Sequence, residues 1–171
     1  MWNDGTRASD LGRKAEEICL EIWGDEFIRN ESGNWLDLHG VDGHLRHAPV
    51  QIKGDRTLAK TRNFYKEHYK KTYETKRDTS LDDWRITPCY AVNLIFITAY
   101  KAYVVSIDSF ARAAIGRQVR QIKPTSIGVL VPMSAVEIKE ERTHEHSLAE
   151  FDDMDTQRAP DISWGEGAIY G

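Results

Sequence analysis

The first part of the chain carries a helical pattern of apolar residues. The positions that share one helical face are Leu11, Ala15, Ile18, Cys19 and Ile22. A spacing of three and four residues is typical of an amphipathic helix, and Gly24 follows as a stop signal. We therefore expect a helix over residues 9–23.

Apolar segments rich in β-branched residues predict strands in much of the remaining chain. The strongest of these segments are VNLIFITA and KAYVVSI, which follow one another almost directly. A weaker pair near the N-terminus is separated by a polar Glu-Ser-Gly turn. The predicted strands are residues 25–30, 34–40, 47–53, 92–99, 101–107 and 126–132.

Two further helices are predicted between these strands. Residues 57–77 contain three tyrosines at a spacing of four, which is typical of one helical face. Residues 109–119 form the other predicted helix, with Asp108 or Ser109 as its N-cap. The resulting order predicts an α/β protein with a mixed β-sheet flanked by helices.

Composition is that of an ordinary globular protein. The chain has 171 residues, of which 40% are hydrophobic and 29% charged, so one domain with a proper core is expected. No run of about 18 apolar residues predicts a membrane span, and the first residues contain no apolar signal core. Two cysteines make no disulfide framework, so we expect a cytoplasmic protein without a membrane partner.

The net charge of −4 conceals an uneven distribution. Residues 60–77 carry seven Lys/Arg and two Glu, whereas residues 137–171 carry ten Asp/Glu and three Lys/Arg. A basic segment of this kind is suited to an anionic partner such as nucleic acid. We interpret residues 140–171 as an acidic C-terminal arm that follows the main domain.

One predicted hairpin combines an acid, an amide and a lysine. Side chains on a strand alternate between faces, so Gln51 and Lys53 share one face and Ile52 takes the other. A two-residue turn at 46–47 would place Asp42 opposite Gln51, and a four-residue loop would place it opposite Lys53. A three-residue loop would pair Asp42 with Ile52 and separate the polar groups.

These groups have the chemistry of a magnesium site. Mg²⁺ prefers oxygen ligands and usually keeps several waters. Asp42 would supply a carboxylate, while the Gln51 amide oxygen and the Ile52 carbonyl would supply neutral ligands. Lys53 would position the attacking water and offset charge on a phosphoryl group. Glu16, at the rim of the first helix, would add an outer carboxylate.

Residues 40–43 (GVDG) followed by residues 51–53 (QIK) resemble the PD-(D/E)XK nuclease superfamily, in the variant typical of Mrr-type restriction nucleases. Residues 12–16 (GRKAE) are similar to the first helix of archaeal Holliday-junction resolvases. The resemblance covers roughly residues 9–100 and implies a restriction-endonuclease-like core of helix, three strands, helix and strand, within a nuclease domain at 1–139. It implies dependence on Mg²⁺, with Mn²⁺ as a substitute. The implied active-site residues are Glu16, Asp42, Gln51 and Lys53.

The Gln-x-Lys motif alone is a weak signal. Residues 121–123 and 137–139 also fit a [Gln/Glu]-x-Lys pattern, but neither has an acid at hairpin distance. Only eight residues separate Asp42 from Gln51, which is short for the resembled family. Asp37 therefore remains an alternative acid.

These features together predict a Mg²⁺-dependent DNA endonuclease. Without a base-reading helix or a separate recognition domain, we expect selection of DNA structure or of a short sequence, and a homodimer would cut both strands. No feature of the sequence excludes RNA as the substrate. The alternative hypothesis is a non-catalytic nucleic-acid-binding or assembly subunit. The predicted phosphate contacts are Lys60, Arg62, Lys66, Lys70 and Lys71.

Overall fold

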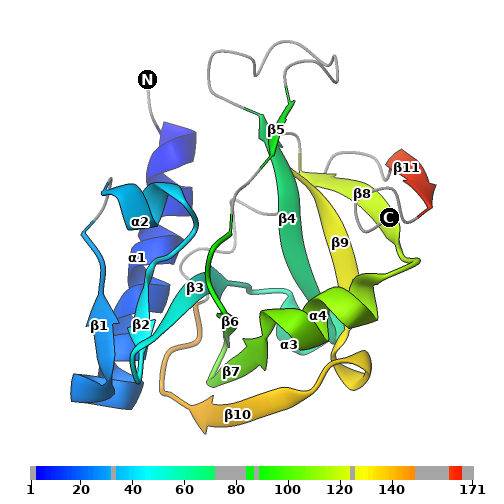
Figure 1. The fold of residues 1–171 in the computed structure, drawn as a ribbon. Coiled ribbons are helices and arrows are strands. Elements are labelled where there is room, and N and C mark those ends of the chain that lie inside the picture. The colour runs from blue at the N-terminus through cyan, green and yellow to red at the C-terminus, as the bar shows by residue number, and fades with distance from the viewer. Residues whose placement is uncertain are drawn as a thin grey trace.

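The chain forms an α/β structure built on two β-sheets (Figure 1). The structure is a computed structural model, and it describes residues 3–31, 34–71, 84–86, 89–123, 126–148 and 162–166. None of the helices in these ranges is long and apolar enough to cross a membrane.

The first sheet is mixed and has six strands in the order β1-β2-β3-β6-β7-β10. Neighbouring strands are antiparallel except for β3 and β6, which run parallel. A parallel pair needs a long crossover, and here the crossover includes β4 and β5 of the second sheet. The strands are β1 (Phe27–Arg29), β2 (Gly43–Leu45), β3 (Ala48–Gly54), β6 (Asn93–Thr98), β7 (Lys101–Ser106) and β10 (Ile138–Thr143).

The second sheet is smaller and antiparallel, in the order β11-β8-β9-β4-β5. Its longest pairing joins β4 to β9, with a register shift between Glu67 and Tyr69. The strands are β4 (Asn63–Lys71), β5 (Trp84–Ile86), β8 (Gln118–Lys123), β9 (Ser126–Pro132) and β11 (Ile162–Glu166).

The two faces of the first sheet are covered differently (Figure 1). Helix α1 (Asn3–Trp23) packs on one face, and the second sheet packs on the other together with α4 (Ile107–Ala114). Ser106 caps α4, because its hydroxyl accepts the Ser109 N–H at 3.0 Å. The shorter elements are α2 (Trp35–Leu38), α3 (Leu58–Thr61) and the 3-10 turns Gly24–Glu26 and Met133–Ala135.

The strong strand patterns are confirmed, but the predicted helix over residues 57–77 is wrong. Within residues 57–71 only residues 58–61 are helical, and β4 begins at Asn63; residues 72–77 lie outside the described part of the chain. Phe64 and Lys66 are both buried, as alternate positions facing one side of a strand would be. Pairing with the apolar strand β9 therefore outweighs the local tyrosine spacing.

Two other predictions need correction. The segment predicted as a strand at 34–40 contains α2, and the helix predicted over 109–119 ends at Ala114, with Gln118 and Val119 already in β8. The proposed boundary at residue 140 falls inside β10, and Leu148 is buried beside α1. Residues 149–161 and 167–171 of the predicted acidic arm lie outside the described residues.

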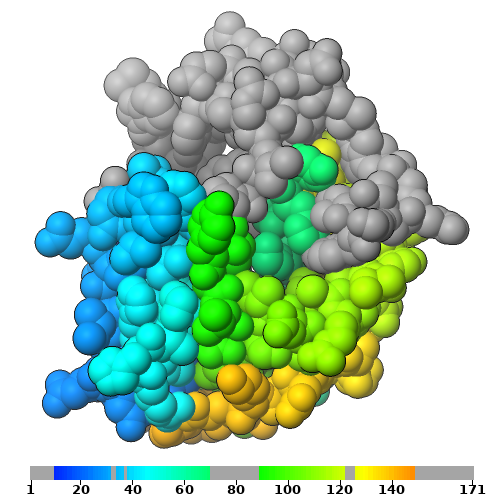
Figure 2. All heavy atoms as spheres, viewed as in Figure 1, coloured from blue at the N-terminus to red at the C-terminus, as the bar shows by residue number. Residues whose placement is uncertain are grey.

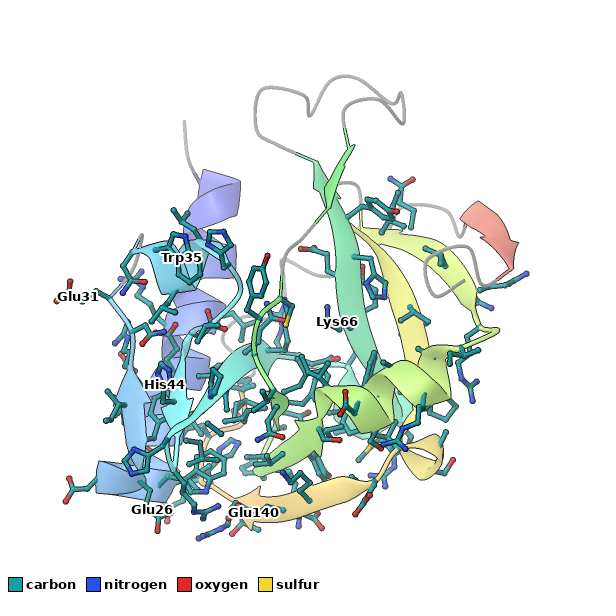
Figure 3. The ribbon with its side chains drawn as sticks, viewed as in Figure 1. Glu26, Glu31, Trp35, His44, Lys66 and Glu140 are labelled. Atoms are coloured by element: carbon teal, nitrogen blue, oxygen red, sulfur yellow. The ribbon has the colours of Figure 1, made fainter. Side chains whose placement is uncertain are left out.

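A charged cluster ties β10 to the β2–β3 turn. The Glu140 carboxylate accepts hydrogen bonds from Arg46 at 2.8 Å, from Arg142 at 2.7 Å and from the Trp23 indole at 3.2 Å. Arg46 also contacts Glu26 at 2.9 Å, and Figure 3 shows both glutamates at this end of the molecule. The Arg46 hydrogen bond is the main reason that the pKa of Glu140 is lowered to about 2.

Glu140→Gln is expected to lower the free energy of unfolding at pH 7 by about 1 to 2 kcal/mol. Because the folded pKa lies near 2, below the ordinary glutamate value of about 4.3, this stabilisation is present above about pH 4 and is lost toward pH 2. Urea unfolding at several pH values measures it. The difference from wild type should shrink on acidification, whereas the exposed neighbour Glu141→Gln should show little change. A difference independent of pH would contradict the assignment.

Candidate functional site

The hairpin has the two-residue turn that one of the sequence alternatives required. Gly43 pairs with Val50 and Leu45 with Ala48, which confirms that register. Arg46 and His47 adopt positive φ angles of 48° and 69°, as a type I′ turn requires. These residue types are unusual there, and the contacts of Arg46 with two glutamates offset the strain.

Gly40 and Gly43, which precede and follow Asp42, are each required for a different steric reason. Gly40 adopts a φ of 76°, a conformation that other residues rarely take. Gly43 lies where β1 approaches β2, and an added Cβ would be 2.6 Å from the Ile28 carbonyl oxygen and 2.7 Å from the Phe27 ring. Backbone conformation therefore favours glycine at position 40, and close packing favours glycine at position 43.

The Asp42 side chain reaches across to β3. The regular β2–β3 ladder ends at the Gly43–Val50 pair, and the Asp42 N–H donates to the Val50 carbonyl at 2.9 Å. One carboxylate oxygen of Asp42 accepts the Ile52 N–H at 2.7 Å. Because the N–H and C=O of one strand residue point to the same edge, the Ile52 carbonyl faces the side on which Asp42 lies. Two predicted oxygen ligands thus share one strand edge.

Gln51 and Lys53 point to the face opposite α1. They align with Leu94 and Phe96 of β6, whose side chains belong to the core between the two sheets. Gln51 is only 6% exposed, and its amide oxygen accepts a hydrogen bond from the Cys89 thiol at 3.5 Å. Gln51 and Lys53 therefore lie where the first sheet faces the second.

The second sheet adds Lys66 to this region. Lys66 comes from β4, is 8% exposed, and lies toward β6 in Figure 3. Burial is the main cause of its lowered pKa; the positive charge of Lys53 lowers it further, whereas Cys89 and Glu67 oppose the shift. The sequence predicts Lys66 as a surface phosphate contact, whereas the structure buries it near Lys53. The spacing of two between Phe64 and Lys66 is the sequence pattern that would have indicated a strand with Lys66 on its buried face.

His68 follows Lys66 on the same strand. Burial, and then the charge of Lys66, lower its pKa to about 4. The imidazole is therefore neutral at pH 7, as a ligand or a proton acceptor must be. No motif in the sequence singles out this histidine.

Glu16 lies on the α1 side of the sheet. Its carboxylate pairs with the Arg29 guanidinium at 2.6 Å. Burial raises the pKa of the Cys19 thiol, and the charges of Glu16 and Asp42 raise it further. Both carboxylates therefore lie near this buried thiol, whereas Gln51 and Lys53 occupy the other face.

The basic residues predicted to share one helical face do not lie on one helix, because α3 ends at Thr61 and β4 begins at Asn63. Lys60 and Arg62 are exposed at the end of α3, and Arg62 has a left-handed backbone conformation. Lys70 and Lys71 occupy the last positions of β4, but their side chains lie outside the described part of the structure, as does that of Asp37.

Within the described ranges, no group of three or more His, Cys, Asp or Glu side chains is arranged to hold a metal. The predicted ligand set is of another kind, with one carboxylate, one amide and one backbone carbonyl. Such a set fits a cation that keeps several of its own waters. It would suit Mg²⁺ or Mn²⁺ better than a cation that needs a closed cage of side chains.

Lys66→Met is expected to stabilise the protein at pH 7, by about 1 to 4 kcal/mol, because a buried cation is replaced by an apolar side chain of similar volume. A lysine pKa lowered by folding means that the unfolded chain binds more protons. Wild-type stability should therefore rise as the pH approaches about 10.4, and this rise should disappear in the variant. Urea unfolding between neutral and alkaline pH measures both effects. The exposed Lys60→Met should change neither, and a marked destabilisation by Lys66→Met would contradict the argument.

Comparison of the chain with models of protein families, with curated proteins and with solved structures found no match in any of the three.

Proposed function

We propose that the chain is a Mg²⁺-dependent endonuclease that hydrolyses phosphodiester bonds in DNA. The observation that carries the proposal is the contact of Asp42 with Ile52, which brings a carboxylate and a backbone carbonyl to one edge of β3. Gln51 and Lys53 precede and follow Ile52 on the same strand, with their side chains on the face toward the second sheet. A carboxylate, a carbonyl and an amide are suitable Mg²⁺ ligands, and bound Mg²⁺ would polarise the phosphoryl oxygen and activate water.

The order of elements supports the proposal. Helix α1, the antiparallel strands β1, β2 and β3, and the parallel strand β6 follow the order of a restriction-endonuclease-like core. One element differs, because α3 and the strands β4 and β5 occupy the crossover in which a helix was expected. Because β4 lies in this crossover, it brings Lys66, and with it a second ammonium group, near Lys53.

Each residue has a role in the proposed reaction. Lys53 orients the attacking water and, with Lys66, offsets the negative charge that develops on the phosphoryl oxygens. The Cys89 thiol donates to the Gln51 amide oxygen and so limits the rotation of the amide. Glu16 acts from the α1 side by favouring cations near Asp42, and its pairing with Arg29 makes it a supporting group.

The test uses the purified full chain with three substrates: a supercoiled plasmid, a branched DNA junction and a single strand. Each is incubated with Mg²⁺, with Mn²⁺ and with a chelator. Cleavage that requires the divalent cation supports the proposal. Salt-sensitive binding to all three substrates, without cleavage under any condition, would overturn it in favour of a non-catalytic nucleic-acid-binding subunit.

A further inference from the structure

Three aromatic rings form a cluster on α2 and on the segment that leads into β6. The Trp35 and His39 rings stack with centroids 4.2 Å apart and an interplanar angle of 28°. Tyr90 lies 5.4 Å from His39 and 6.3 Å from Trp35, and its ring is within 19° of the Trp35 plane. We call these three residues the aromatic platform.

The aromatic platform is exposed to solvent, and hydrogen bonds to the backbone hold its residues in place. Trp35 is 65% exposed and Tyr90 is 63% exposed. His39 Nδ1 contacts the Trp35 carbonyl at 2.7 Å, and the Tyr90 N–H donates to the His39 carbonyl at 3.0 Å. Large aromatic surface that is ordered but left in water is typical of a binding site.

The platform adjoins the proposed catalytic groups through short stretches of backbone. Tyr90 follows Cys89, whose thiol contacts Gln51. His39 precedes Asp42 by three residues in a turn that the Val41 N–H closes on the Leu36 carbonyl at 2.9 Å. In Figure 2 the bright green segment near residue 90 runs along the surface between the light blue α2 region and β4. Figure 3 shows Trp35 and Lys66 on either side of that segment.

We infer that the aromatic platform stacks an unpaired nucleobase, while Lys53 and Lys66 attract the adjoining phosphate. Every nucleobase has a flat face that can stack on aromatic side chains. Proteins that bind single strands combine such side chains with cationic groups that attract the phosphate backbone of the nucleic acid. Bases inside a continuous duplex already stack on each other, so they are not available to a platform at the protein surface. This inference rests on the proposed function and narrows its substrate to nucleic acid with single-stranded or branched character.

The test measures binding in the presence of a chelator, so that cleavage plays no part. Fluorescein-labelled single-stranded DNA, single-stranded RNA of the same sequence and the matching DNA duplex are titrated with the full chain at fixed salt. Trp35→Ala should weaken single-strand binding by about 5- to 150-fold, the loss expected when one base loses its aromatic partner. Trp35→Phe should restore most of the affinity, and duplex binding should change little.

Leu38→Ala is the matched control, because Leu38 is 66% exposed on the same short helix and is not one of the three rings. The control should bind the single strands as wild type does, and circular dichroism should give wild-type spectra for all variants. The DNA and RNA strands together show whether the platform distinguishes the sugar. Equal single-strand affinity in wild type and Trp35→Ala would overturn the inference. It would do so even if the chain cuts DNA, whereas Trp35-dependent binding without cleavage would support the inference and reject the proposed endonuclease.

Discussion

Asp42→Asn and Lys53→Met are each expected to lower Mg²⁺-dependent cleavage by about 100- to 1,000-fold, while the protein stays folded. Asn keeps an oxygen that can accept the Ile52 N–H, so the β2–β3 contact is retained while the negative charge is lost. Without that charge, a divalent cation is held only by neutral oxygens. Lys53→Met keeps the length of the side chain but removes the ammonium group.

The measurement is the initial rate of plasmid nicking at saturating Mg²⁺, with urea unfolding of each variant in parallel. Lys101→Met is the matched control, since Lys101 pairs with Glu141 at the surface, at 3.2 Å, and belongs to β7. This control should cut as fast as wild type. Wild-type cleavage by both Asp42→Asn and Lys53→Met would remove the site from consideration.

Phe64→Ala is expected to reduce the free energy of unfolding by about 3 to 5 kcal/mol. Phe64 has no exposed surface and stacks on Phe96 with centroids 4.4 Å apart, so it joins β4 of the second sheet to β6 of the first. Its ring also meets Tyr103 edge-on at 6.1 Å. Truncation would leave a cavity between the sheets and weaken the packing that carries Lys66.

Chemical denaturation measures this loss, and Phe64→Leu should retain most of the stability because it leaves a smaller cavity. Ile115→Ala is the control for removing apolar atoms from the surface, since Ile115 is 63% exposed; it should stay within about 0.5 kcal/mol of wild type. A loss in Phe64→Ala no larger than that of the control would show that the two sheets do not depend on this contact.

The sequence was sufficient where local signals agreed with one another. Strands β6 and β7 were predicted because their continuous β-branched and apolar residues suit a buried strand at every position. Helix α1 was predicted because its apolar spacing places Ala15, Ile18 and Cys19 on one face. Alternation along β3 correctly separated Gln51 and Lys53 from Ile52.

The sequence was misleading where a segment could satisfy two periodicities. The stretch that forms β4 has tyrosines four apart, which suits a helix, and also has Phe64 and Lys66 two apart, which suits a strand. The choice depended on β9, a partner about sixty residues away that offers a complementary apolar edge. No local pattern contains that information.

Some features of the candidate site likewise follow from the sequence, and others depend on the tertiary structure. The sequence by itself determined which charges and oxygen ligands the hairpin carries, and that Gln51 and Lys53 share one face of β3. Only the tertiary structure decided that the Asp42 carboxylate reaches the Ile52 backbone, that Lys66 is buried and that Glu140 holds the turn. The physical reason is that the charge of a side chain is a property of the residue, whereas its burial and its partners depend on which distant strands pair.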